Sequence, residues 1–318
     1  MKKNNFLLLF AIFCLMSGYT HAAKWRINNA GVPANFTTAS EAVNSPLVAN
    51  GDTLYFESSI NNYGGVGIAK RLVLSGPGYY LGENDSTQAD VKPASLATIT
   101  FNNGSQGSIV KGMSFMESLQ VNTSGITIER NHIMAGFSVL SGSGIVIIRN
   151  YILYMILNST QNVLISNNIF VSENPYGNCL DIQSSASATV MNNVFLGRVG
   201  LCNAVFRNNI CTAINMNPLF TNNNSVVENN IGASTQFEAA NGNQQNVDMS
   251  TVFIYTGSSD GKYRLKPGSP AIAAGVEGAD CGVFGGNYPY ALSGMVNGPS
   301  VWYLNMNGND VTVKAKSN

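Results

Sequence analysis

Short apolar strands that end in asparagine recur along the middle of this 318-residue chain. The clearest copies run over residues 125–133, 144–152 and 162–170, and weaker copies follow. Within each copy the apolar residues alternate, so they point to one face of a strand. Asparagine returns at one position of the repeat, with spacings of 19, 18, 25, 16 and 21 residues. These asparagines are Asn131, Asn150, Asn168, Asn193, Asn209 and Asn230.

This period predicts the fold class. About 20 residues per repeat, with no helical pattern between strands, leaves too little chain for parallel strands joined by crossover helices. We therefore expect an all-β fold, a single right-handed parallel β-helix of about nine or ten rungs. An antiparallel sandwich is the alternative, but no hairpin turn signal lies between the repeats. We expect the asparagines to take left-handed backbone angles at a turn and to form a hydrogen-bonded structural ladder.

Residues 1–22 follow a different pattern. Two early lysines precede an apolar run over 6–16, and small residues follow it. This order is typical of a secretory signal peptide, with cleavage expected after Ala22 or Ala23. An uncleaved membrane anchor is the alternative. We therefore expect export, to secretion or to the cell surface, with no transmembrane segment after removal of the signal.

The rest of the chain divides into three parts. Residues 23–71 are predicted to form the first strands and an N-terminal cap, including a short amphipathic helix over 36–43. Residues 72–275 carry the β-helix, interrupted by a polar insertion over 81–97. Residues 276–318 are predicted to form a C-terminal cap that ends in a hairpin. Caps are expected because a solenoid must cover its open core at both ends. A small surface-attachment element is the alternative for the tail.

Composition and charge exclude some partners. Only 11% of residues are charged and the formal net charge is zero, whereas an average globular domain is about 25% charged. A protein that binds nucleic acid by electrostatics has a basic stripe, which this composition does not favour. The sequence also gives no support for a polybasic membrane patch.

Four cysteines remain after the signal peptide, and export makes disulfides possible. Four cysteines allow three pairings, and the sequence does not choose among them. Free buried thiols are the alternative, since cysteine packs well as a small apolar residue. A zinc site is disfavoured, because no CxxC pair is present and the mature chain has one histidine. The cysteines are Cys179, Cys202, Cys211 and Cys281.

Several segments resemble a known family. They are the strand entry Gly51-Asp52-Thr53, the rung over 72–79, the asparagine-ended repeats, and the segments YRLKPGSPAIAAG over 263–275 and DCGVFGG over 280–286. Together they resemble the secreted pectate-lyase-like right-handed parallel β-helix repeat proteins, most closely those of Bacteroidetes-type bacteria. That family contains polysaccharide lyases, polygalacturonases and adhesins, so the resemblance implies the fold and leaves the activity open.

In lyases of this family acidic residues hold Ca²⁺ on the outer face of a strand ladder, beside a basic residue that removes a proton. The outward ladder expected here has one carboxylate, Asp181. Glu173, in the loop over 172–178, is the second candidate for a catalytic pair, and solvated surface acids are the alternative. The metal is unknown and no cofactor is evident; Ca²⁺ is expected only if the protein is a lyase. The ladder positions are Thr100, Gln120, Ser138, Ile156 and Asp181.

Candidate ligand-binding residues lie at the turns. Arg130 and Arg149 occupy matching positions on successive rungs, where a stacked pair can bind an anionic sugar. His132 follows the first turn, and Tyr151 and Tyr176 are candidates for stacking on sugar rings. The alternatives are solvent-facing charges and core aromatics.

The middle rungs also place apolar residues on the outside. A contiguous exposed patch of this kind marks a binding site, unless the 81–97 insertion or the C-terminal tail covers it. Its members are Val146, Ile148, Tyr151, Leu153 and Ile156.

The sequence thus favours a non-catalytic, extracellular or cell-surface protein that binds glycans or contributes to adhesion. The expected partner is an extracellular polysaccharide or cell-surface glycan. The first alternative is a lyase or glycoside hydrolase that acts on an acidic polysaccharide through Asp181 and Glu173. The second is a structural envelope component. No nucleotide-binding loop, dinucleotide fingerprint, nucleophile elbow or HExxH motif is present.

Overall fold

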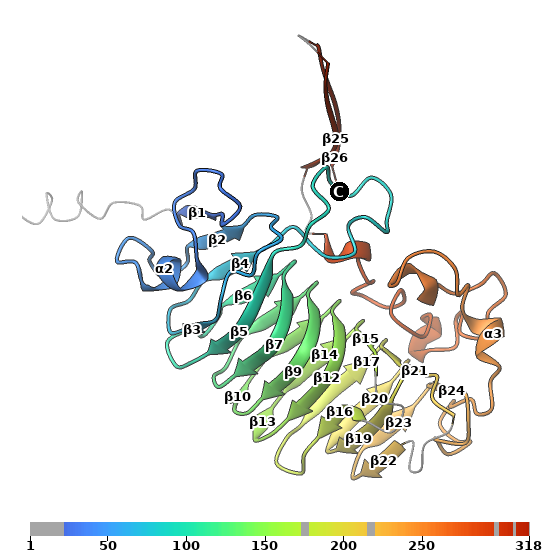
Figure 1. Ribbon diagram of the computed structural model, residues 1–318. Helices are drawn as coiled ribbons and strands as arrows, with labels where there is room; N and C mark the ends of the chain where they lie inside the picture. The colour runs from blue at the N-terminus through green and yellow to red at the C-terminus, as the bar shows by residue number, and fades with distance from the viewer. Residues whose placement is uncertain (1–21, 173–177, 215–219, 296–298, 308–309, 318) are drawn as a thin grey trace, which may run out of the picture.

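The computed structural model describes residues 22–172, 178–214, 220–295, 299–307 and 310–317. It is a parallel β-solenoid of about eight turns with very little helix, which confirms the predicted all-β fold class (Figure 1). We expected nine or ten rungs. The described residues form ten strands in one sheet, sheet A, and twelve in the other, sheet B. Successive repeats therefore stack along one axis, each adding strands to the same sheets.

Sheet A contains short strands in a continuous parallel stack that follows chain order. Its outer face carries two rows of side chains, since successive residues of a strand point to opposite faces. Its strands are β1 (Lys24–Ile27), β2 (Thr53–Phe56), β4 (Val73–Ser75), β6 (Ile109–Lys111), β8 (Thr127–Glu129), β11 (Val146–Ile148), β14 (Val163–Ser166), β17 (Ala188–Met191), β20 (Ala204–Arg207) and β23 (Val226–Glu228).

Sheet B contains longer strands that split toward the C-terminal end. The polar insertion ends earlier than the expected residue 97, because strand pairing in β5 already begins at Ser95. The strands are β3 (Val66–Ile68), β5 (Ser95–Phe101), β7 (Ser114–Val121), β9 (His132–Val139), β12 (Tyr151–Leu157), β15 (Ile169–Phe170), β16 (Asn178–Ile182), β18 (Val194–Phe195), β19 (Arg198–Cys202), β21 (Ile210–Cys211), β22 (Phe220–Asn223) and β24 (Ile231–Gly232). A separate small pair is formed by β10 (Gly142–Ser143) and β13 (Thr160–Gln161).

The main core lies inside the solenoid. The inward column of sheet A is fully buried from β2 to β20, and the rings of Phe170 and Phe195 stack 4.7 Å apart. Burying one such side chain contributes about 1.5–3 kcal/mol, so the repeated column stabilises every rung. The column is Leu54, Leu74, Val110, Ile128, Ile147, Ile165, Val190 and Phe206.

The six repeated asparagines form a buried ladder between the two sheets. Each side-chain amide donates to the side-chain carbonyl of the next rung at 3.0–3.1 Å, and Asn230 continues the ladder to Asn243. The expected left-handed angles are wrong for these residues: the residue just before each ladder asparagine has the positive φ. The preceding residue makes the turn, which leaves the asparagine free to bond inward. Those preceding residues are Arg130, Arg149, Asn167, Asn192, Asn208 and Asn229.

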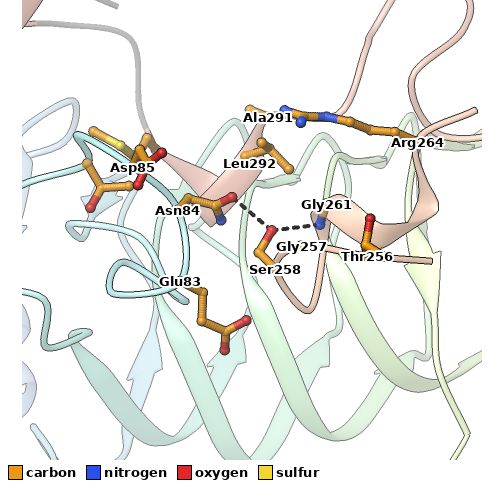
Figure 2. A pocket seen from close by; sticks show the side chains of 12 residues that line it. Glu83, Asn84, Asp85, Thr256, Gly257, Ser258, Gly261, Arg264, Ala291 and Leu292 are labelled. Atoms are coloured by element: carbon orange, nitrogen blue, oxygen red, sulfur yellow. Dashed lines mark hydrogen bonds between the residues drawn. The ribbon is translucent and has the colours of Figure 1, made fainter. Parts of the chain in front are cut away.

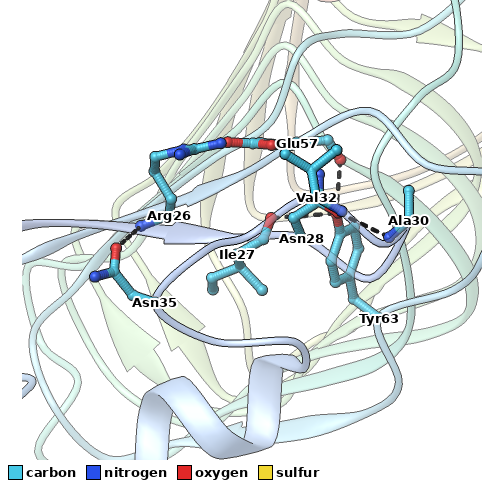
Figure 3. Close-up of polar contacts among 8 residues, drawn as sticks. All are labelled: Arg26, Ile27, Asn28, Ala30, Val32, Asn35, Glu57 and Tyr63. Atoms are coloured by element: carbon cyan, nitrogen blue, oxygen red, sulfur yellow. Dashed lines mark hydrogen bonds and ion pairs between the residues drawn. The ribbon is translucent and has the colours of Figure 1, made fainter.

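The N-terminal end of the core is closed by α2 (Ala39–Asn44), where a helix was expected. Thr38 caps this helix in a capping box with Glu41. Beside it Glu57 accepts from Arg26 at 2.5 Å and from Asn28 at 2.7 Å (Figure 3). These contacts join β1 to the chain after β2 and hold the cap against the first layer of core.

The chain leaves the solenoid sheets after β24 and continues through short elements. These are α3 (Met249–Val252) and the 3-10 turns η1 (Gly261–Tyr263), η2 (Val276–Gly278) and η3 (Leu292–Gly294). The expected hairpin is present as β25 (Pro299–Asn307) paired antiparallel with β26 (Asp310–Ser317), and it projects from the body (Figure 1). A second apolar cluster forms where these segments pack on the outside of the solenoid.

Candidate functional site

Residues 274–295, which we call the strap, run back along the turn edge of the solenoid. Six clamp residues, the positive-φ residues that precede the ladder asparagines, bond to its backbone at 2.7–3.2 Å. The order of contacts is reversed: the last rung holds the start of the strap and an early rung holds its end. The pairs are Arg130 with Met295, Arg149 with Pro289, Asn167 with Val283 and Gly285, Asn192 with Asp280, Asn208 with Val276, and Asn229 with Ala274.

The arginine pair predicted to bind sugar belongs to this clamp row. Arg130 is buried, and its Nη1 donates to the Met295 carbonyl at 3.2 Å. Burial is the main cause that lowers the pKa of Arg130. The Nε of Arg149 donates to the Pro289 carbonyl at 2.9 Å, and its guanidinium lies 5.9 Å from the ring centre of Tyr288. Both arginines therefore position the strap, and a ligand role stays a prediction.

His132 and Tyr151 lie together beneath the strap in an aromatic cluster with Tyr79 and Tyr80. Ring centres in this cluster are 4.9–5.5 Å apart. The Tyr80 hydroxyl lies 3.1 Å from Nε2 of His132, and the Tyr79 hydroxyl contacts that of Tyr290. Burial lowers the pKa of His132 to about 4, so the ring is neutral at pH 7. The cluster joins the polar insertion and the strap to the solenoid.

A buried carboxylate locks three distant segments together. Asp260 is fully buried and accepts from Asn84 at 3.0 Å, from the Ser258 hydroxyl at 2.9 Å and from the Ser293 backbone at 2.7 Å. The Ser258 hydroxyl also lies 2.8 Å from the Asn84 side-chain carbonyl, so its one hydrogen is shared between the two acceptors (Figure 2). Three donors satisfy a charge that would otherwise be costly to bury. The insertion, the segment around 256–261 and the strap are thereby fixed relative to one another.

Above this network lies an open cavity of about 510 Å³ (Figure 2). Glu83, Asp85 and Arg264 line it with exposed charged groups, and Leu292 and Met295 provide an apolar wall. The full lining is Glu83, Asn84, Asp85, Thr87, Thr256, Gly257, Ser258, Gly261, Arg264, Ala291, Leu292 and Met295. Carboxylates accept and a guanidinium donates hydrogen bonds, so this cavity, the junction pocket, suits a ligand rich in hydroxyl groups.

Of the two predicted catalytic residues, Asp181 lies on sheet B, away from the junction pocket, and Glu173 is not among the described residues. The outward row of sheet B runs in register from Thr100 through Ser138 to Asp181, as expected. Asp181 is its one carboxylate, and its charge adds to burial in raising the pKa of the nearby Tyr154. Glu173 and Tyr176 lie outside the described residues. Within the described ranges, no group of three or more acidic, histidine or cysteine side chains is placed to hold a metal ion.

The prediction of one contiguous exposed apolar patch is wrong. Ile148 and Tyr151 are 6% and 7% exposed, since Tyr151 packs with the strap in the second apolar cluster. Leu153 packs against the same cluster, whereas Ile156 faces outward from sheet B beside Asp181. The alternative, that the C-terminal tail packs over these side chains, therefore holds for Tyr151 and Leu153.

The four cysteines are free thiols in this structure, and all but Cys202 are buried. Burial raises the pKa of Cys179 and of Cys281 to about 12. Both thiols are therefore protonated and unreactive at neutral pH. No described helix is long and apolar enough to cross a membrane.

Sequence reasoning missed the junction pocket because its walls come from segments about 170 residues apart. Two signals point to it in retrospect: the polar insertion between two rungs, and the Asn-Asn pairs whose first member clamps the strap. Comparison of the chain with protein-family models, with curated proteins and with solved structures finds no match. The geometry of the site is therefore the basis for a functional assignment.

Proposed function

We propose that this protein is a non-catalytic, pectate-lyase-like β-helix protein that binds an extracellular or cell-surface glycan in the junction pocket. The observation that carries the proposal is the set of exposed charged groups of Glu83, Asp85 and Arg264 around one cavity. The repeats supply a rigid rod, and the segments that interrupt them supply the recognition surface.

The chemistry of the pocket fits a sugar. Glycan hydroxyls donate to carboxylates and accept from a guanidinium, and the less polar face of a sugar ring packs on an apolar wall such as Leu292 and Met295. One Glu83 oxygen already accepts from the Ser259 backbone at 2.7 Å, which fixes the side chain. Rigid placement lowers the entropy lost on binding. The Asp260 network supplies that rigidity beneath the pocket.

A polysaccharide lyase or glycoside hydrolase is the second candidate, and the described residues favour it less. Ca²⁺ takes six to eight oxygen ligands, and the outer row of sheet B offers one carboxylate, Asp181. Glycosidases use a pair of carboxyl groups, and Glu83 and Asp85 both line the junction pocket. Release of sugar products that is lost in Glu83→Gln/Asp85→Asn would assign that activity to the junction pocket. A structural envelope role predicts neither binding nor turnover.

Export is part of the proposal. The backbone nitrogen of Ala23 lies 2.7 Å from Oδ1 of the buried Asp52. Cleavage after Ala22 would turn that nitrogen into an α-ammonium group, which pairs with a carboxylate better than an amide does. Mass spectrometry of the protein from an exporting host tests this: a mature chain that begins at Ala23 supports it, and an intact leader contradicts it.

Binding to an array of neutral glycans, followed by calorimetry on the best ligand, tests the pocket. The variant Asp85→Asn/Arg264→Gln keeps the net charge and replaces two charged groups with neutral amides. Hydrogen bonds to charged groups contribute about 1.5–3 kcal/mol, so we expect affinity to fall by about tenfold or more. The control Glu117→Gln alters an exposed carboxylate outside the pocket. Unchanged affinity in the double variant would rule out this site.

A further inference from the structure

A second cavity, of about 580 Å³, lies on the outer face of sheet A at its N-terminal end. It crosses strands β1, β2, β4 and β6, and none of its described lining residues belongs to the strap. Its lining is Lys24, Trp25, Arg26, Thr53, Tyr55, Val73, Ser75 and Lys111. We call it the sheet A groove.

The groove has an ordered floor because the strands are in register. One outward row pairs Arg26 with Tyr55, Tyr55 with Ser75, and Ser75 with Lys111. The parallel row pairs Lys24 with Thr53 and Thr53 with Val73. Neighbouring strands lie about 4.8 Å apart, so the cations at the two ends of the floor are separated by roughly 14 Å. The site therefore suits an extended ligand.

Charge in the groove has one sign. Lys24, Arg26 and Lys111 line it, and none of its lining residues in the described part of the chain is a carboxylate. Arg26 is oriented by its ion pair with Glu57 (Figure 3). Lys24 and Lys111 have no ion pair with any residue that the structure describes. On the next strand, β8, Glu129 pairs in register with Lys111 of β6. Its negative charge ends the run of cations along this outward row. The groove therefore attracts an anion, in contrast to the net charge of zero.

An aromatic ring lies between the charged ends. Tyr55 is 41% exposed, so much of its ring is open to a ligand in the groove. Amphipathic rings of this kind provide contact area at binding sites, and Thr53 and Ser75 add hydroxyl groups beside it. Along this row the side chains follow the order cation, aromatic ring, hydroxyl and cation, from Arg26 to Lys111. This order suits a chain of sugar rings that carry acidic groups.

We propose that the sheet A groove binds an anionic saccharide, with Lys24, Arg26 and Lys111 on its carboxylate or sulfate groups and Tyr55 against a ring. A single-stranded nucleic acid is favoured less, because such proteins stack successive bases on several aromatic side chains, and of the two aromatic lining residues Tyr55 is on an outward row whereas Trp25 is not. The site is independent of the junction pocket, since the two cavities share no lining residue.

Calorimetric titration tests the groove with four probes: a galacturonate hexamer, a sulfated hexasaccharide, neutral maltohexaose, and an oligonucleotide matched in charge to the sulfated probe. We expect both acidic saccharides to bind the wild-type protein more tightly than the neutral one, and more weakly as salt screens the charges. The difference between the two acidic probes shows which acidic group is preferred. Failure of both acidic probes to bind, or tighter binding of the oligonucleotide, overturns the proposal.

Variants assign the binding to the groove. Lys24→Gln/Lys111→Gln removes two positive charges, and we expect at least tenfold weaker binding of the acidic saccharides. The control Lys92→Gln/Arg207→Gln removes the same charge from exposed or partly exposed positions, including the far end of the same outward row. Equal losses in both variants would overturn the proposal. The junction-pocket variant Asp85→Asn/Arg264→Gln must retain acidic binding, so the two sites fail separately.

Discussion

The side-chain amide of Asn150 donates a hydrogen bond to the side-chain carbonyl of Asn168, 3.0 Å away, and both residues are fully buried. The same amide nitrogen also lies within bonding distance of the Ile128 and Ile148 carbonyls, at 2.9 and 3.0 Å. The Asn168 carbonyl accepts in addition from the Asn150 backbone at 2.9 Å. One residue type thus satisfies the buried polar groups of a turn and links each rung to the next.

Replacing one ladder asparagine should destabilise the whole rod. Asn150→Ala leaves several buried groups without partners, each costing about 1–3 kcal/mol. We expect a loss of about 3 kcal/mol or more in the free energy of unfolding, measured by urea denaturation. The control Asn222→Ala alters an exposed residue and should change stability by less than about 0.5 kcal/mol. Equal effects of the two variants would show that the ladder contributes nothing specific.

Removing one clamp side chain should release the strap without unfolding the solenoid. Asn167→Gly keeps the positive φ but removes the bonds from Asn167 to Val283 and Gly285. We expect faster hydrogen exchange over residues 280–290 and unchanged exchange in β12 and β14. Asn162→Gly is the matched control, because Asn162 also has positive φ and is exposed. Faster exchange in both variants would mean that glycine alone loosens the chain.

Asp52 should make the protein sensitive to acid. Burial raises the pKa of Asp52, but hydrogen bonds from Trp25, Ala49 and Ala23 outweigh it and hold the pKa below the usual value. A lowered carboxyl pKa contributes stability above the unfolded value, about 3.9, that is lost as pH falls through the folded value. We expect the melting temperature of the wild-type protein to drop more between pH 5 and pH 2.5 than that of Asp52→Asn. Parallel curves would contradict this.

His132 should also make the protein less stable as pH falls, but over a higher pH range than Asp52. Its folded pKa of about 4 lies below the unfolded value of about 6.5, so the unfolded chain binds more protons between these values. Stability is fully present above pH 6.5 and declines as pH falls toward 4. His132→Gln should flatten this part of the melting curve while preserving that below pH 4. A slope unchanged by the substitution would show that another group titrates.

The rod was predictable from sequence because its signals are local. Alternating apolar residues and a repeated asparagine define the strands, the stacking and the buried column from Leu54 to Phe206. The backbone angle was misassigned by one residue, since Asn167 and Asn168 carry the same side chain and differ only in which of them bonds inward. Nothing in composition separates them.

The site was less predictable because its contacts are long-range. Arg130 was singled out for its charge, yet its partner, Met295, lies 165 residues away in a segment with no repeat. The junction pocket likewise joins Asp85 to Arg264. Asp181, in contrast, lies on the predicted outward row, because that position follows from strand alternation alone.

Hydrogen exchange with and without a bound neutral glycan tests most directly whether the interrupting segments carry the function. The account predicts protection over residues 81–87, 256–264 and 291–295, with exchange unchanged along the outer row of sheet B from Thr100 to Asp181. Protection of that outer row, with the junction pocket unaffected, would contradict the account and show that the glycan binds on the outer face of sheet B.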